Sequence, residues 1–233
     1  MAVMLAGCSS SGADTTTTTT TSTVATPSAP ATNVIPTDYD GYRAQATACG
    51  DDPADPVTAM TFPQAGDGNV DGSVTVTLET SCGAIVITLD PSVAPETVNS
   101  FVFLAEQGYF DGSVSHRVLP GFMMQAGDPT ATGRGGPGYT VPDEFPRGDF
   151  TYDRGVVAMA NAGSGTTGSQ FFIMFDAADW LPPNYSVFGT VSDGFETLDA
   201  IEALPLGMNP NGADPSPSVP LQTLYIKSVT VQR

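Results

Sequence analysis

Apolar and polar residues alternate along the chain between positions 73 and 79. Val74, Val76 and Leu78 are separated by single polar residues, and this period of two is typical of a strand with one buried face. A second apolar run, AIVITL, begins at Ala84 after a short connection. Together the two runs predict an antiparallel hairpin.

The hydrophobic period changes in residues 94–108, APETVNSFVFLAEQG. The apolar residues there have the i, i+3, i+4, i+7 spacing of an amphipathic helix: Val98, Phe101, Val102 and Ala105. Pro95 suits the first turn of that helix, and Gly108 suits its end. Residues 194–204, GFETLDAIEAL, also show near-helical spacing. The sequence therefore predicts two helices.

Six further short apolar segments are strand candidates: SHRVL, GFMMQAG, GVVAMAN, SQFFIMF, SVFGTV and LQTLYIKSVTVQ. Many short strands, few helices, and 25 Gly with 20 Pro favour an antiparallel barrel or sandwich over a parallel α/β sheet. No apolar stretch reaches the length of a transmembrane helix. We therefore expect one mainly β domain preceded by a tail.

The chain is strongly acidic, with 25 Asp and Glu against 7 Lys and Arg and a formal net charge of -18. A nucleic-acid partner is excluded, because such binding draws most of its affinity from clustered cations. An anionic membrane surface would repel the chain as well. With 1 His, 3 Cys and no CxxC or HExxH motif, the sequence offers no basis for a metal site, and we expect neither metal nor cofactor.

The first residues, MAVMLAGC, place Leu5, Ala6 and Gly7 directly before Cys8. This pattern resembles the lipobox of bacterial lipoproteins, in which the cysteine is acylated and becomes the mature N-terminus. We interpret residues 1–8 as a lipoprotein signal remnant, and we expect an extracytoplasmic protein held to the bacterial cell membrane by a lipid anchor only. A chance run of small residues is the alternative, because no Lys or Arg precedes the cysteine.

The segment after the lipobox is rich in Thr, Ser, Ala and Pro and has too few large apolar residues to form a packed core. We predict a disordered stalk over residues 9–42, an N-terminal extension over 43–72 and the folded domain over 73–233. In an exported chain, the two remaining cysteines predict a disulfide between Cys49 and Cys82. Two unpaired buried thiols are the alternative.

Residues 115–128, SHRVLPGFMMQAGD, contain the chain's only histidine and one of its few basic residues, Arg117. An unpaired charge is costly to bury, yet Arg117 stands in a mostly apolar run that also contains Gln125. A hydrophobic floor with a polar edge is what a small ligand pocket needs. From residue type alone, a structural ion pair is the alternative role for Arg117. We interpret His116 as a structural residue.

Three ordered blocks resemble the cyclophilin family of peptidyl-prolyl cis-trans isomerases: HRVLPGFMMQAGD (116–128), GVVAMANAGSGTTGSQFFIMF (155–175) and WLPPNYSVFG (180–189). The resemblance extends from about Val74 to Val231. It implies a mainly β fold, a closed eight-stranded antiparallel β-barrel capped by two α-helices. The two helices predicted above fit that arrangement.

The resemblance makes Arg117 the catalytic arginine and Gln125 the residue that orients the guanidinium and binds the peptide. The proline ring would lie on four apolar residues: Phe122, Met123, Phe172 and Leu181. The other substrate-binding residues offer main-chain groups or stand at the rim: Ala160, Asn161, Trp180 and Tyr185. The implied partners are proline-containing polypeptides and cyclic peptide inhibitors of the cyclosporin type, and we expect a monomer.

The residue types also fit the reaction. Rotation about an amide crosses a barrier of about 18–20 kcal/mol, and for an X–Pro bond it takes tens to hundreds of seconds without a catalyst. In the twisted transition state the imide nitrogen loses resonance and becomes pyramidal. A fixed planar guanidinium that donates to this nitrogen, or to the proline carbonyl, stabilises that state selectively. The sequence thus predicts a surface-anchored isomerase that accelerates folding of exported proteins.

The chain departs from the family pattern at positions near the pocket. Tyr185 replaces a residue that is often His, Ala126 stands where Gly is usual, and Ser115 stands where an aromatic residue often precedes the His-Arg pair. We expect activity with altered peptide preference and inhibitor affinity. The alternative function is a peptide-binding or chaperone module with weak or no catalysis. The loop GRGGPG, residues 133–138, lacks the ending of a phosphate-binding loop and is interpreted as a solvated loop beside the pocket.

Overall fold

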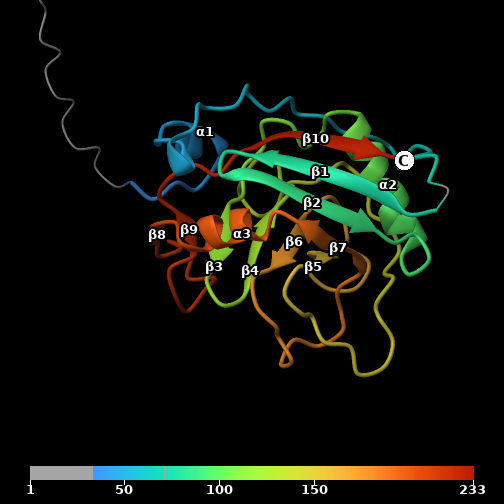
Figure 1. Ribbon diagram of the computed structural model, residues 1–233. Helices are drawn as coiled ribbons and strands as arrows, with labels where there is room; N and C mark the ends of the chain where they lie inside the picture. Colours follow the sequence, from blue (N-terminus) through green and yellow to red (C-terminus); the bar gives the residue numbers. More distant parts are fainter. Residues whose placement is uncertain (1–33, 71) are drawn as a thin grey trace, which may run out of the picture. The chain divides into compact units, whose positions relative to one another are not determined.

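The computed structural model describes residues 34–70 and 72–233 (Figure 1). The helices are α1 (Tyr39–Arg43), the 3₁₀ helix η1 (Ala48–Gly50), α2 (Pro95–Glu106) and α3 (Phe195–Glu202). The strands are β1 (Val74–Thr80), β2 (Gly83–Leu89), β3 (Arg117–Leu119), β4 (Met123–Ala126), β5 (Val156–Met159), β6 (Phe171–Met174), β7 (Val187–Asp193), β8 (Leu206–Gly207), β9 (Val219–Pro220) and β10 (Ile226–Gln232). The predicted lipoprotein signal with Cys8, and the predicted stalk as far as residue 33, lie outside the described residues.

Eight strands form one antiparallel sheet in the order β10-β1-β2-β7-β5-β6-β4-β3. The sheet is strongly curled but open, because β10 and β3 are its two edges. The fold is mainly β, as the sequence predicts, but the prediction of a closed barrel is wrong. The reason is local. Backbone hydrogen bonds join residues 112–115, before β3, to residues 224–226, but in β3 itself the Val118 N–H donates to the Ser218 carbonyl (2.8 Å) and not to β10.

The first two strands form the predicted hairpin. Val76 pairs with Ile87 and Leu78 pairs with Ile85. All four side chains are buried, because alternate residues of the two strands share the inner face of the sheet. Gly83 follows the turn with a φ of 126°, a conformation that residues with a side chain rarely adopt.

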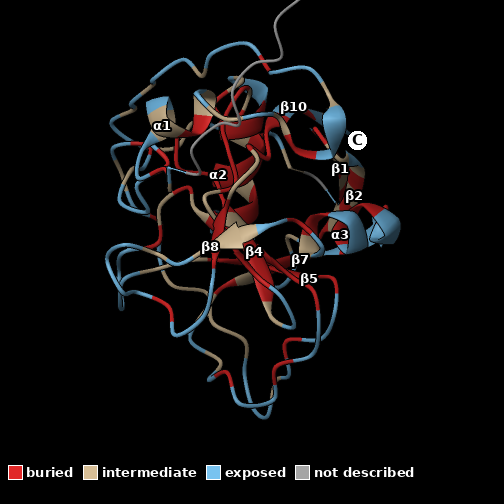
Figure 2. Ribbon diagram, turned by 90° about the vertical axis from the view of Figure 1, so that its left-hand side faces the viewer, coloured by how far each residue is buried: buried red, intermediate tan, exposed pale blue. Residues whose placement is uncertain are grey.

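Both predicted helices are present, as α2 and α3. Figure 2 shows that α2 is buried along most of its length. The ring of Phe101 in this helix contacts three core rings at centroid distances of 5.0, 5.4 and 5.0 Å: Phe110, Phe171 and Phe188. α3 packs against β2 and β3. Among the described helices, none combines the length and the apolar character that a bilayer-crossing segment requires.

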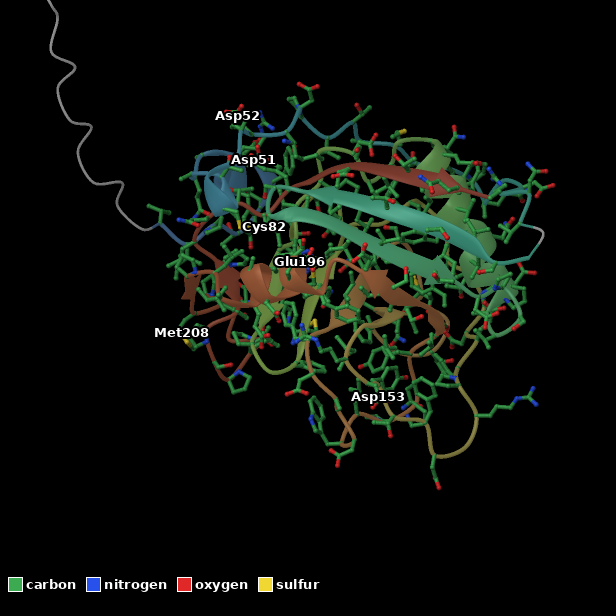
Figure 3. The ribbon with its side chains drawn as sticks, viewed as in Figure 1. Asp51, Asp52, Cys82, Asp153, Glu196 and Met208 are labelled. Atoms are coloured by element: carbon green, nitrogen blue, oxygen red, sulfur yellow. A yellow bond between two sulfur atoms is a disulfide. The ribbon has the colours of Figure 1, made fainter. Side chains whose placement is uncertain are left out.

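The N-terminal extension begins with a helix that the sequence analysis did not predict. α1 includes the last residues assigned to the stalk, and its Tyr42 is buried. The folded domain therefore includes residues that the predicted stalk boundary at position 42 excludes. Cys82, labelled in Figure 3, forms a disulfide with Cys49 across a Cα–Cα distance of 5.2 Å. This bond attaches the extension covalently to the turn between β1 and β2.

The extension then runs along the domain to α2. Asn99 in α2 donates to the Gly66 carbonyl at 2.9 Å. The ring of Phe62 contacts that of Phe103 at a centroid distance of 5.1 Å. The Phe62 N–H also donates to the carbonyl of Pro137 at 2.7 Å. The extension thus supports both α2 and the glycine-rich loop that contains Pro137.

Candidate active site

Arg117 and Gln125 are direct neighbours across the β3–β4 hairpin. The two strands are joined by a tight turn in which Gly121 has a φ of 71° and the Phe122 N–H donates to the Leu119 carbonyl at 3.0 Å. Nη1 of Arg117 donates to Oε1 of Gln125 at 3.1 Å. The hairpin therefore places the guanidinium beside an amide that accepts from it.

The other side of the guanidinium is occupied by Asp214, which the sequence analysis did not single out. Nε of Arg117 donates to both carboxylate oxygens, at 3.1 and 3.0 Å, and Nη2 donates to Oδ1 at 2.5 Å. The Asp214 side chain is 2% exposed, whereas that of Arg117 remains 30% exposed. Burial acts to raise the pKa of Asp214, but the hydrogen bonds from Arg117 bring it below its ordinary value. Arg117 is thus paired and still open to a ligand.

A chain of amide groups continues from Gln125. Its Nε2 donates to Oε1 of Gln170 at 2.9 Å, and Nε2 of Gln170 donates to the Gly135 carbonyl at 3.0 Å. Each amide is a donor on one side and an acceptor on the other, so the orientation of one fixes that of the next. The guanidinium is linked in this way to the glycine-rich loop of residues 133–140.

A second buried carboxylate, Asp128, organises the start of that loop. It accepts from the main-chain N–H groups of Thr130, Arg134 and Gly135 at 2.7, 3.0 and 3.0 Å. Burial acts to raise the pKa of Asp128, but the hydrogen bonds from Thr130 and Gly135 bring it below its ordinary value. A Cβ at Gly135 would lie 1.9 Å from Oδ1 of Asp128, so only glycine fits at this position.

Six of the predicted substrate-binding residues lie in one apolar cluster that is separate from the main core: Phe122, Met123, Ala160, Phe172, Leu181 and Tyr185. Phe172 pairs with Gln125 in the β4–β6 register, which places this cluster beside the amide that holds the guanidinium. The rings of Phe172 and Tyr185 meet edge to face at 5.4 Å. Phe122 and Tyr185 are only partly buried and form the outer part of the cluster.

Two predicted residues lie at the edge of this cluster. Trp180 is 65% exposed, and its ring lies 4.9 Å from that of Phe122 between centroids. Nδ2 of Asn161 donates to the carbonyl of Asn184 at 2.9 Å. Seven of the eight predicted substrate-binding residues thus lie in or against this cluster, and Asn161 is hydrogen-bonded to the residue that precedes Tyr185.

A groove of about 800 Å³ is lined by Gln125, Ala160, Asn161 and the glycine-rich loop of residues 133–140. The loop that was interpreted as a solvated loop beside the pocket thus contributes to the lining of the groove. Gln125, which also lines the groove, pairs with Arg117 and with Phe172 of the apolar cluster.

His116 precedes Arg117 but adds no charge to the site. Its Nδ1 is buried and has no hydrogen-bond partner among the described residues. Burial lowers the pKa of His116 to about 4, with nearby Asp128 acting in the opposite direction and Arg117 in the same one. The imidazole is therefore neutral at pH 7.

A curled antiparallel sheet, a paired arginine at its edge, an apolar cluster and a groove define a mainly β protein with a candidate ligand site at one edge of its sheet. Residues 75–231 match the family model described as cyclophilin-type peptidyl-prolyl cis-trans isomerase/CLD. The chain belongs to the cyclophilin family and is a peptidyl-prolyl cis-trans isomerase.

Similar proteins support this assignment. The chain is 43% identical over 174 residues to peptidyl-prolyl cis-trans isomerase B of Streptomyces anulatus, covering 67% of this chain and 95% of that protein. It is 41% identical over 161 residues to human peptidyl-prolyl cis-trans isomerase-like 3, covering 68% and 96%. A crystal structure of a cyclophilin-type isomerase from Cryptosporidium parvum matches with a TM-score of 0.61 and 33% identity, covering 69% and 98%. A second structure of that protein, determined in the presence of the dipeptide Ala-Pro, matches with a TM-score of 0.61 and 34% identity, covering 68% and 99%.

Sequence reasoning missed Asp214, which lies 97 positions after Arg117 in a segment rich in Pro and Gly. An arginine in an apolar run does predict a counter-charge. However, 25 acidic residues were available, and no periodicity distinguishes Asp214 from the others. Gln170 was missed although it stands inside the block 155–175, because only Ala160, Asn161 and Phe172 of that block were given a role.

Proposed function

We propose that Arg117 performs the isomerisation by donating hydrogen bonds to the twisted imide of a bound X–Pro bond. The observation that carries this proposal is that Asp214 and Gln125 fix the guanidinium of Arg117 while the Arg117 side chain remains 30% exposed. Donors held in place before the reaction lose no reorganisation energy when charge develops in the transition state. The planar ion keeps its charge throughout, so no proton transfer is needed.

The apolar cluster holds the proline ring while the preceding carbonyl rotates. Phe172, Met123 and Leu181 supply its buried base, and Phe122 supplies its partly exposed side. The N–H of Ala160 is already donated to the Gln170 carbonyl at 2.9 Å, so Ala160 offers its carbonyl to an extended peptide. Asn161 offers main-chain groups to the peptide, and Trp180 and Tyr185 stand at the rim of the pocket. These are the roles that the family resemblance implies for the same positions.

Peptides that contain proline are the substrates in this proposal. The Cryptosporidium parvum relative determined with Ala-Pro supports this substrate class. Cyclic peptides of the cyclosporin type are inhibitors that bind the same apolar cluster and Trp180. Tyr185 and Ala126 tune the affinity for both kinds of ligand, because they replace the side chains that the family usually carries near the pocket.

The test compares the wild-type chain with Arg117→Ala in an X–Pro isomerisation assay and in a proline-peptide binding assay. Removal of one preorganised donor lowers a rate by about 10²- to 10³-fold, so we expect at least about a 100-fold loss of kcat/KM. Peptide affinity should change much less, because the apolar cluster is intact. Wild-type kcat/KM in a correctly folded Arg117→Ala variant would refute the assignment.

We propose separately that the chain is a bacterial lipoprotein that acts on exported proteins outside the cytoplasm. The sequence LAGC at positions 5–8 supports acylation of Cys8. The Cys49–Cys82 disulfide supports an oxidising compartment, because disulfides persist mainly there. Mass spectrometry of the protein from its native membrane tests this proposal. An N-terminal diacylglyceryl cysteine at position 8 is expected, and an unmodified thiol at Cys8 would contradict it.

A further inference from the structure

Two carboxylates stand apart from the acidic surface of the domain. Of the acidic side chains in residues 34–70 and 72–233, only Asp128 and Asp214 are buried. Asp128 is satisfied by the loop that it organises. Asp214 instead directs both oxygens to the guanidinium of Arg117. Asp214 is thus buried against the proposed catalytic group, whereas the exposed carboxylates of the domain serve to keep its surface soluble.

The loop that carries Asp214 is attached to the strand that carries Arg117. Asp214 lies between β8 and β9, in a loop whose first residue, Met208, is labelled in Figure 3. Near the end of this loop, the Ser218 carbonyl accepts from the N–H of Val118 at 2.8 Å, and the Ser218 N–H donates to the Gly207 carbonyl at 3.0 Å. The loop that carries Asp214 is therefore attached by a backbone hydrogen bond to the residue that follows Arg117.

The hydrogen bonds leave a defined set of donors free for a ligand. A guanidinium has five N–H groups: one on Nε and two on each terminal nitrogen. Asp214 accepts from Nε and from Nη2, and Gln125 accepts from Nη1. Within the part of the chain that the structure describes, one N–H on each terminal nitrogen has no acceptor. The two acceptors thus determine which edge of the ion is presented to a substrate.

We propose that Asp214 is a positioning residue for the isomerisation, which holds the Arg117 guanidinium so that its two remaining terminal N–H groups point at the rotating imide. This inference rests on the proposed role of Arg117. A free arginine side chain has several rotatable bonds and loses much rotamer freedom when it is fixed in one geometry. The hydrogen bonds from Nε and Nη2 to the Asp214 carboxylate fix that geometry before substrate binds. Small misplacements of a catalytic group lower rates strongly, by as much as about 100-fold for about 1 Å.

The experiment measures kcat and KM separately for the full-length wild type, Asp214→Asn, Arg117→Ala and the double variant. The asparagine keeps the side-chain shape, but it removes the negative charge and replaces one of the two acceptor oxygens, to which Nε donates at 3.0 Å, with an amide group that cannot accept. We expect kcat of Asp214→Asn to fall by about ten-fold while KM stays within about two-fold, because Asp214 holds the guanidinium and does not touch the peptide. In the Arg117→Ala background the same substitution should change kcat by less than about two-fold, because the group that it positions is absent.

Asp199→Asn is the matched control. Asp199 pairs with Arg154 at 2.6 Å, but this pair is on the surface, with side chains 64% and 38% exposed. We expect wild-type kcat from this control. The ¹⁵N spectrum adds a direct readout, in which the Arg117 Nε–H should be protected from exchange in the wild type and lose protection in Asp214→Asn.

Two results would overturn the inference and leave the role of Arg117 intact. One is a kcat of Asp214→Asn equal to that of the wild type, measured alongside an Arg117→Ala variant that is inactive. The other is an equal loss from Asp214→Asn in both backgrounds, which would mean that the carboxylate acts on the loop and not through the guanidinium. Full activity of Arg117→Ala would instead refute the proposed function, and the positioning role with it.

Discussion

The hydroxyl of Tyr42 donates to the main-chain oxygen of His116 at 2.8 Å, so the N-terminal extension is hydrogen-bonded to the residue directly before Arg117. Tyr42 is buried, and burial raises the pKa of its hydroxyl above the ordinary value. The main-chain oxygen of Tyr42 in turn accepts from the hydroxyl of Thr223. The extension is therefore part of the structure that supports the site.

Tyr42→Phe should destabilise the domain by about 1 kcal/mol, because the part-buried hydrogen bond from its hydroxyl to the His116 carbonyl is lost. Urea denaturation monitored by circular dichroism measures the change. The midpoint should fall without a change in slope. An unchanged midpoint would show that water replaces the lost hydroxyl and that the contact contributes little.

The Cys49–Cys82 disulfide should account for a larger part of the stability. It closes a loop with a sequence separation of 33 residues. The chain-entropy relation assigns such a loop about 3–4 kcal/mol. We expect a stability loss of this size in the Cys49→Ser, Cys82→Ser double variant, measured by denaturant titration under oxidising conditions. The same loss should follow reduction of the wild type, whereas the double variant should not respond to reductant.

The only histidine gives the chain a clear pH signature. Burial lowers the pKa of His116 to about 4 from an ordinary value of 6.5, so between these two values the unfolded chain binds more protons than the folded one. Stability should therefore rise with pH over this window, by up to about 1.4 kcal/mol per pH unit, and level off above 6.5. Denaturation midpoints from pH 4.5 to 7.5 measure the slope.

His116→Asn is the control for this pH dependence, because it removes the titrating group and keeps the main-chain oxygen that Tyr42 contacts. The slope between pH 4.5 and 6.5 should then disappear. A titration of the imidazole by NMR with a midpoint near 6.5 would contradict the account.

Two adjacent glycines of the groove loop should differ sharply in their tolerance of a methyl group. In Gly135→Ala the new Cβ would lie 1.9 Å from the Asp128 carboxylate, whereas a Cβ at Gly136 meets nothing within 4 Å. We expect Gly135→Ala to weaken binding of a proline peptide and to lower stability by about 1–3 kcal/mol, because the N–H donors to Asp128 must shift. Gly136→Ala should behave like the wild type. Similar peptide affinities for the two variants would show that this loop does not form the peptide groove.

The sequence predicts the parts of the fold that are set by local patterns. Val74, Val76 and Leu78 alternate because one face of β1 is buried, and this periodicity is visible without the structure. The sequence did not predict that the sheet stays open between its edge strands, β3 and β10. β3 has only three residues, and the hydrogen bond from Val118 goes to Ser218 beside β9 rather than to β10. Such long-range pairing leaves no periodic signal in a strand this short.

In the candidate site, too, residues in local sequence blocks could be predicted, whereas residues brought in by long-range contacts could not. Arg117, Gln125 and Phe172 lie in blocks whose order and spacing carry the family resemblance, so their proximity could be predicted. Asp214 lies in a loop of irregular sequence, and only the folded chain brings it to Arg117. Tyr42 was assigned to the stalk because the segment around it resembles a polar linker, although its ring is buried.

The measurement that tests the central claim most directly is the rate of cis–trans exchange of a saturating X–Pro peptide on the enzyme, compared between the wild type and Arg117→Lys. Lysine keeps the positive charge but lacks the planar fork that Asp214 and Gln125 hold. The account predicts that the exchange rate of Arg117→Lys is at least about ten-fold lower at similar peptide affinity. Equal exchange rates would contradict it, because they would show that a positive charge suffices and that the fixed guanidinium does not perform the catalysis.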